Sequence, residues 1–138
     1  MGWPLRLGAG LLALGLVACA SSAGPAQLTG SVSYRERIAL PAGAVLHVAL
    51  LDVSLVGTPA RVIAQQEIRP AGRMPIPFAL EYDRAAIDTG RRYGLRATIS
   101  DAGGRMLFAN VTTLSVFREG APEAVTIWVQ RVQSGPAP

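Results

Sequence analysis

Residues 75–83, Pro-Ile-Pro-Phe-Ala-Leu-Glu-Tyr-Asp, place large apolar side chains at every second position. Successive side chains of a β-strand point to opposite faces of its sheet, whereas an amphipathic helix needs a period near 3.6. The stretch therefore predicts a half-buried strand. We expect Phe78 and Leu80 to lie in the core and Glu81 to face water.

The same period of two recurs over most of the chain. Further strands are predicted at residues 28–35, 44–53, 61–68, 93–100, 105–112, 114–117 and 124–132. The segments between them carry turn-forming residues, and Asp101-Ala-Gly-Gly104 predicts a hairpin. Residues 84–90 are expected to form one helical turn, and Gly30 interrupts its strand pattern as a bulge or a close backbone approach does. Seven or eight short strands predict an all-β fold, a single small antiparallel β-sandwich.

Composition limits both the size of the fold and its chemistry. The chain has 138 residues, half of them hydrophobic, which is enough for one modest domain. One histidine and one cysteine exclude a disulfide framework and argue against a metal site or a cofactor held by such ligands. The 13 basic residues, all arginine, exceed the 9 acidic ones only slightly, which argues against nucleic acid as a partner.

The N-terminal residues have the pattern of an export signal. Arg6 precedes twelve uncharged residues, 7–18, which is too short a run for a spanning helix. The run ends in Leu16-Val-Ala-Cys19, which resembles the lipobox of bacterial lipoproteins. The resemblance implies cleavage before Cys19 and acylation of its thiol and its amine, and several acyl chains give stable membrane anchoring. The alternative is a free cysteine at the end of an ordinary signal peptide.

These observations predict four segments. They are a lipoprotein signal peptide (1–18), a lipidated tether (19–27), a β-sandwich domain (28–133) and a disordered tail (134–138). The resemblance to bacterial lipoproteins also implies a sorting rule, in which an aspartate directly after the cysteine retains the protein in the inner membrane, and here that position is Ala20. We therefore expect an outer-membrane lipoprotein whose domain faces the periplasm.

Candidate catalytic groups are few. His47 is the one imidazole, and a nucleophile–base pair would need it beside a serine or a cysteine and oriented by a carboxylate. Glu81 and Asp83 are two residues apart on one strand face, as a carboxylate pair of a hydrolase could be, but the same spacing suits a solvated face. We expect no catalytic residue and no enzyme activity.

Arg35 and Arg37 alternate with Glu36 at the end of the first predicted strand. One interpretation is a solvated edge that discourages aggregation. The other is an arginine pair that binds a partner protein or stabilises the fold. If the strand continues through both arginines, they share one face.

Several blocks of the chain resemble the YbaY family of bacterial lipoproteins, which is grouped with the YscW-type pilotins of type III secretion. These blocks are Leu28–Pro41, Leu51–Ser54, Pro75–Asp83, Ile87–Asp88 and Tyr93–Ile99. The resemblance implies a β-sandwich lipoprotein facing the periplasm. Pilotins of the family bind the C-terminal tail of a secretin subunit and carry it to the outer membrane, and the family supplies no known catalytic residues.

Three functions remain open at this point. The first, which we favour, is a non-enzymatic lipoprotein of envelope maintenance or assembly that binds a protein partner through an exposed strand. The second is a secretin pilotin. The third is a small-ligand-binding or hydrolytic envelope protein, which a pocket holding His47 beside two carboxylates would favour.

Overall fold

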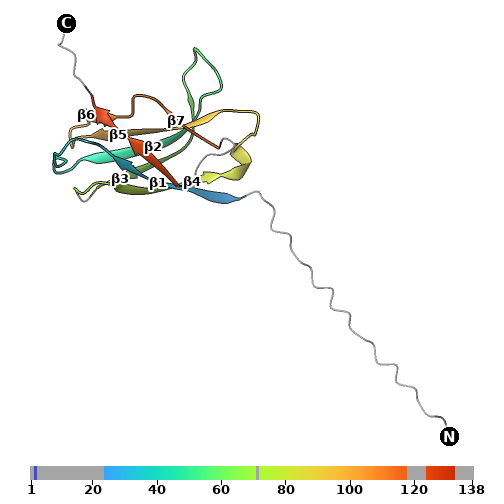
Figure 1. The fold of residues 1–138 in the computed structure, drawn as a ribbon. Helices are drawn as coiled ribbons and strands as arrows, with labels where there is room; N and C mark the ends of the chain where they lie inside the picture. Colours follow the sequence, from blue (N-terminus) through green and yellow to red (C-terminus); the bar gives the residue numbers. More distant parts are fainter. Residues whose placement is uncertain (1, 3–23, 71, 118–123, 133–138) are drawn as a thin grey trace.

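A computed structural model describes residue 2 and residues 24–70, 72–117 and 124–132. The described residues form nine β-strands and one short 3-10 helix, so the predicted all-β fold is confirmed. Figure 1 shows the strands packed as a flattened sandwich, with β1 and β4 on one side and β5 and β7 on the other. The elements are β1 (Pro25–Ser33), β2 (Val45–Asp52), β3 (Arg61–Ile68), β4 (Ile76–Asp83), η1 (Arg84–Ala86), β5 (Tyr93–Ser100), β6 (Met106–Ala109), β7 (Leu114–Val116), β8 (Ala124–Trp128) and β9 (Gln130–Arg131).

The strands form two sheets. Sheet A has the order β4-β1-β8, and sheet B has the order β3-β2-β5-β6-β9, with β7 also paired to β5. Neighbouring strands are antiparallel except β1 and β8, which run parallel, with Thr29 opposite Ala124. Parallel neighbours need a long crossover connection. Here the crossover is the chain between β1 and β8, which builds β4 and most of sheet B.

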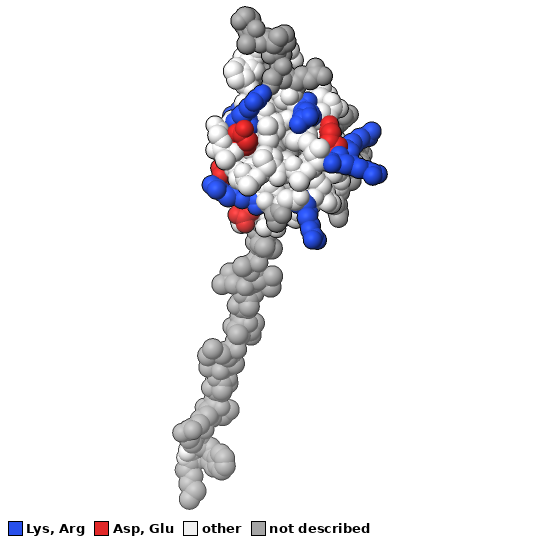
Figure 2. Space-filling model, turned by 90° about the vertical axis from the view of Figure 1, so that its left-hand side faces the viewer, with Lys and Arg blue, Asp and Glu red and all other residues white. Residues whose placement is uncertain are grey.

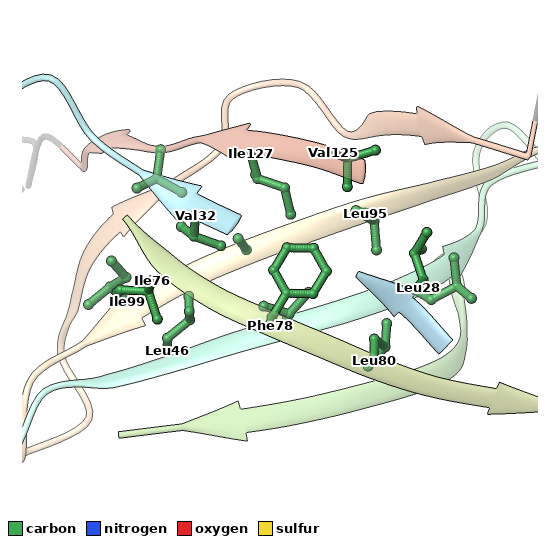
Figure 3. Close-up of a cluster of buried hydrophobic side chains, with 14 of the residues drawn as sticks. Leu28, Val32, Leu46, Ile76, Phe78, Leu80, Leu95, Ile99, Val125 and Ile127 are labelled. Atoms are coloured by element: carbon green, nitrogen blue, oxygen red, sulfur yellow. The ribbon is translucent and has the colours of Figure 1, made fainter. Parts of the chain in front are cut away.

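The core lies between the two sheets. Figure 3 shows the ring of Phe78 at its centre, among aliphatic side chains from both sheets. Phe78 is 4% exposed and Leu80 is 1% exposed, whereas Glu81 faces solvent, so the predicted register of this strand is confirmed. The facing side chains of sheet B, such as Leu46 and Leu95, are fully buried.

Strand β1 begins at Pro25, three residues before the predicted boundary at Leu28, so residues 25–27 lie in sheet A and not in a tether. Pro25 pairs with Asp83, and Ala26 is buried. Residues 25–27 have the small and polar composition of a flexible linker. A short segment at the start of a strand can have the same composition, so composition alone did not distinguish the two. Proline is tolerated at the first residue of a strand.

Gly30 is a close-approach position, as its gap in the strand pattern suggested. A Cβ atom at Gly30 would lie 2.2 Å from the carbonyl oxygen of Val125 and 2.9 Å from the Phe78 ring. Any side chain at this position would force β8 or the Phe78 ring to move.

Two predicted strands are interrupted. The segment 105–112 forms a strand only as far as Ala109, and the segment 124–132 divides at Val129 into β8 of sheet A and β9 of sheet B. The final strand thus passes from one sheet to the other. The predicted hairpin at 101–104 is confirmed, and the Gly104 amide donates a hydrogen bond to the Asp101 carbonyl at 3.0 Å. The helical turn predicted at 84–90 is shorter than expected and is limited to η1, Arg84–Ala86.

Asn110 occupies the gap between β6 and β7. Its side-chain oxygen accepts a hydrogen bond from the Ala97 amide at 3.0 Å, and its side-chain nitrogen donates to the Leu95 carbonyl at 2.9 Å and to the Thr112 carbonyl at 3.0 Å. The Asn110 side chain therefore replaces the missing strand residue beside β5, where backbone groups must be paired.

Candidate functional site

The outer side of β8 is an open sheet edge. Within the described residues β8 pairs with β1 alone, so it has no neighbour on its other side. Val125 and Ile127 point into the core, whereas Ala124, Thr126 and Trp128 are exposed. Such an edge presents unpaired backbone N–H and C=O groups that another strand can bind.

Trp128 is the largest apolar side chain on this edge, and it is 51% exposed. It lies opposite Ser33, the last residue of β1. The guanidinium carbon of Arg35 lies 5.3 Å from the centroid of the Trp128 ring, which is a cation–π geometry. Tryptophan and arginine are the residue types most enriched among the residues that dominate binding energy at protein interfaces.

Tyr34 positions Arg35. Its ring is buried and stacks on Phe108 with the ring centroids 4.7 Å apart. Its hydroxyl donates to the carbonyl oxygen of Ile38, which closes the segment that follows β1 into a tight loop. Burial, together with the nearby Glu36 carboxylate, raises the pKa of the Tyr34 hydroxyl, so it remains a donor at neutral pH.

Arg35 and Arg37 would share one strand face only if the first strand continued through them, and it does not. Strand β1 ends at Ser33, and both arginines lie in the loop after it. Tyr34 ends the strand because its side chain turns into the core while its hydroxyl holds the chain at Ile38. Both arginines are exposed, and Arg35 lies against Trp128.

An open cleft of about 540 Å³ lies beside the Trp128 ring. It is lined by Arg35, Glu36, Trp128, Val129, Gln130 and Arg131. Two arginines and one glutamate leave it with a small positive charge. Figure 2 looks at the end of the sandwich away from the start of β1. There blue and red side chains are interspersed with uncharged surface and do not merge into a field of one sign.

The candidate catalytic residues do not converge. His47 is exposed on the outer face of sheet B, between Glu67 of β3 and Thr98 of β5. Glu81 and Asp83 are exposed on β4 of sheet A, and the Asp83 carboxylate accepts a hydrogen bond from the Ala85 amide at 2.9 Å. The structure therefore places the imidazole and the two carboxylates on different sheets.

The opposite end of the sandwich holds a charge pair that the sequence did not reveal. The Arg91 guanidinium donates to the Asp52 carboxylate at 2.8 Å, and the Ser54 amide donates to it at 3.0 Å. Hydrogen bonding lowers the pKa of the Asp52 carboxyl to about 2. The larger contribution comes from the hydroxyl and the amide of Ser54, and the next from Arg91. The pair joins the end of β2 to the segment before β5, so its role is structural.

Cys19, the predicted lipidation residue, lies outside the described residues, as do residues 1, 3–18 and 134–138. Over the described part of the chain, no helix has the length and hydrophobicity needed to cross a membrane. No cluster of three or more potential metal ligands occurs among the same residues.

Sequence reasoning also missed Trp128 and Asn110. The alternation Ala124-Val-Thr-Ile-Trp128 does carry a signal, because it places Trp128 on the same outward face as Thr126. Nothing in the pattern around Asn110 indicates that its side chain completes the sheet.

Comparison with known proteins links the chain to a protein family, to a lipoprotein and to a solved structure. The profile of a family described as a type III secretion system lipoprotein chaperone (YscW) matches residues 24–129. An uncharacterized lipoprotein YbaY of Escherichia coli (strain K12) is 34% identical over 98 residues, which are 70% of this chain and 51% of that protein, so the chain spans about half the length of this relative. A solved structure, an alternative pilotin from the type II secretion system of Vibrio cholerae, is 38% identical with a TM-score of 0.74, covering 80% of this chain and 100% of that chain.

Proposed function

Because the chain belongs to the YscW family of type III secretion system lipoprotein chaperones, we propose that it is a lipid-anchored envelope chaperone that binds another protein and catalyses no reaction. The similar proteins support the lipoprotein character and a binding role. The observation that carries the proposal is the half-exposed Trp128 on an open sheet edge, with Arg35 over its ring.

Cys19 is the proposed anchor. It is the one cysteine of the chain, and it closes the Leu-Val-Ala-Cys motif. Ala20 after it favours sorting to the outer membrane, with the domain in the periplasm. The shared family of lipoproteins supports anchoring as such.

The partner is proposed to bind along β8. A segment of the partner in extended conformation would add a strand to sheet A and use the outward backbone groups of β8. An apolar side chain of the partner segment would pack on Trp128, and acidic residues of the same segment would lie near Arg35 and Arg131. Charges of this kind raise the association rate and set the register more than they raise affinity.

A component of a secretion system is the class of partner that the comparisons favour. The family description and the similar solved structure both name secretion systems. We therefore put the pilotin function ahead of general envelope maintenance, which was the first expectation from the sequence. The two functions differ in the identity of the partner.

A photo-crosslinking amino acid at position 126 tests this proposal in cells that express the lipidated protein. Thr126 is exposed on β8, and His47, exposed on the outer face of sheet B, is the matched control position. We expect one adduct from position 126, identified by mass spectrometry as an envelope secretion protein, and none from position 47. General maintenance would instead give an envelope protein outside secretion systems.

Surface substitutions complete the test. Trp128→Ala should weaken capture by about 2 kcal/mol or more, which is about 30-fold in Kd. The pair Arg35→Glu and Arg37→Glu should weaken capture in a salt-dependent way. The triple variant His47→Ala, Glu81→Ala and Asp83→Ala should retain function, and loss of function in a folded, anchored triple variant would reopen the enzyme hypothesis.

A further inference from the structure

The early start of β1 shortens the connection to the membrane. Pro25 lies six residues after Cys19, and six steps along a fully extended chain reach at most about 20 Å. If Cys19 carries the lipid, as the proposed function holds, the end of the sandwich where β1 begins stays close to the head groups. We call this the anchor end: the start of β1, the β2–β3 loop with its two flanking residues (52–61), residues 83–92 and Phe117.

Hydrogen bonds join these segments. The Arg84 amide donates to the Gly24 carbonyl at 3.1 Å, which ties η1 to the start of β1. The Val53 amide donates to the Arg92 carbonyl at 2.9 Å, and the Arg92 amide donates to the Ser54 hydroxyl at 2.8 Å. Figure 1 shows the β2–β3 loop projecting beyond the sandwich.

The anchor end exposes apolar side chains. Leu55 is 69% exposed and Val56 is 92% exposed, and they are neighbours on the projecting loop. Phe117 is 39% exposed and lines an open cleft of about 420 Å³ together with Val56. Adjacent apolar side chains on a projecting loop gain free energy when they enter a membrane interface, in proportion to the apolar area buried.

Arginines surround these apolar side chains. Arg61, Arg84, Arg91 and Arg92 are all exposed at this end. Of the acidic residues there, Asp52 is buried against Arg91, and the Asp83 and Asp88 carboxylates accept bonds from the Ala85 and Gly90 amides, each at 2.9 Å. The net charge of these seven residues is slightly positive, which is compatible with anionic head groups. Because this excess is small, the exposed apolar side chains Leu55 and Val56 supply most of the attraction to the membrane.

We propose that the anchor end docks on the same membrane that holds the lipid, with Leu55 and Val56 inserted among the head groups. The occupant of this surface is therefore phospholipid. The short connection keeps the loop at a high effective concentration next to the bilayer, so a weak contact is enough to hold it. Docking would fix the orientation of the domain, with the cleft at Trp128 directed away from the membrane.

Fluorescence quenching tests the docking on the lipidated full chain. Val56→Cys introduces one labelling site, because the acylated Cys19 has no free thiol. The protein is labelled with an environment-sensitive dye and placed in phosphatidylethanolamine–phosphatidylglycerol vesicles that contain a shallow nitroxide lipid. Ala102→Cys, exposed on the β5–β6 hairpin at the opposite end, is the matched control.

We expect a blue shift and loss of fluorescence for the label at position 56 and neither for the label at position 102. Thr58→Cys places a label on an exposed residue of the same loop. This label should lose its quenching when Leu55→Ser and Val56→Ser are introduced, changes that an exposed loop tolerates. Equal signals at positions 56 and 102, or none at 56, would overturn the inference. Vesicle flotation is measured on the same samples, so protein that floats without quenching refutes the docking and leaves the lipid anchor standing.

Discussion

Asn110→Ala should destabilise the domain far more than its partly exposed position suggests. The substitution removes the acceptor for the Ala97 amide and the donor to the Leu95 carbonyl. Both residues are 0% exposed, so water cannot readily replace the lost partners. A buried backbone group left without a partner costs about 1 to 3 kcal/mol, so the two together cost about 2 to 6 kcal/mol.

Such a loss is measurable by thermal unfolding followed by circular dichroism. For a domain of this size, each 1 kcal/mol lowers the Tm by about 4 to 8 °C, so a fall of at least about 8 °C is expected. Val111→Ala is the matched control, because Val111 is the next residue and is 78% exposed; it should change the stability by about 0.5 kcal/mol or less. If Asn110→Ala and Val111→Ala melt at the same temperature, the account of Asn110 as a substitute for a strand residue is wrong.

Three further predictions follow from burial, charge and the lipobox. Phe78→Ala should cost about 3 to 5 kcal/mol of unfolding free energy and Glu81→Ala little, and equal chemical-denaturation midpoints would contradict the register. Asp52 has a folded-state pKa of about 2, below its ordinary value of about 3.9, so the stability that it contributes is complete above about pH 4 and is lost as the pH falls towards 2. Asp52→Asn should therefore flatten the fall in Tm between pH 5 and 2. An unchanged dependence of Tm on pH in this variant would refute the assignment. Cys19→Ala should leave an uncleaved or soluble precursor, and palmitate labelling of this variant in the outer membrane would refute the anchor.

The parts of the fold that depend on local alternation could be predicted, and those that depend on distant pairing could not. Strands β3 and β5 begin and end at the predicted residues, and β4 begins one residue after the start of the predicted stretch. The alternation between core and solvent is regular in most of β4, whereas β3 has no fully buried residue and β5 begins with three buried residues in a row. The parallel pairing of β1 with β8 leaves no trace in a period of two, since strand direction does not change which face a side chain occupies.

The candidate site shows the same limit. Arg35 was singled out from its charge pattern, but its contact depends on Trp128, which lies far away in the sequence. The first strand ends before Arg37 for a local reason. Tyr34 fits the strand alternation by burying its ring, yet its hydroxyl bond to Ile38 bends the chain out of the sheet. A period of two records burial and says nothing of where a hydrogen bond ends the strand.

The length of β1 links the two proposals. Strand β1 runs from Pro25 at the anchor end to Ser33, and its eight rises of about 3.3 Å separate these residues by about 26 Å. Ser33 lies opposite Trp128. With the anchor end on the bilayer, Trp128 would lie as far from the head groups as β1 is long, and a partner bound along β8 would contact it there. A longer tether would let the domain tumble and would bring the open edge towards the lipid, where extended segments of other proteins are less accessible. Inserting a flexible segment between Ala20 and Ser21 should therefore leave anchoring intact and reduce crosslinking from position 126, whereas unchanged crosslinking would show that orientation by the membrane does not matter for capture.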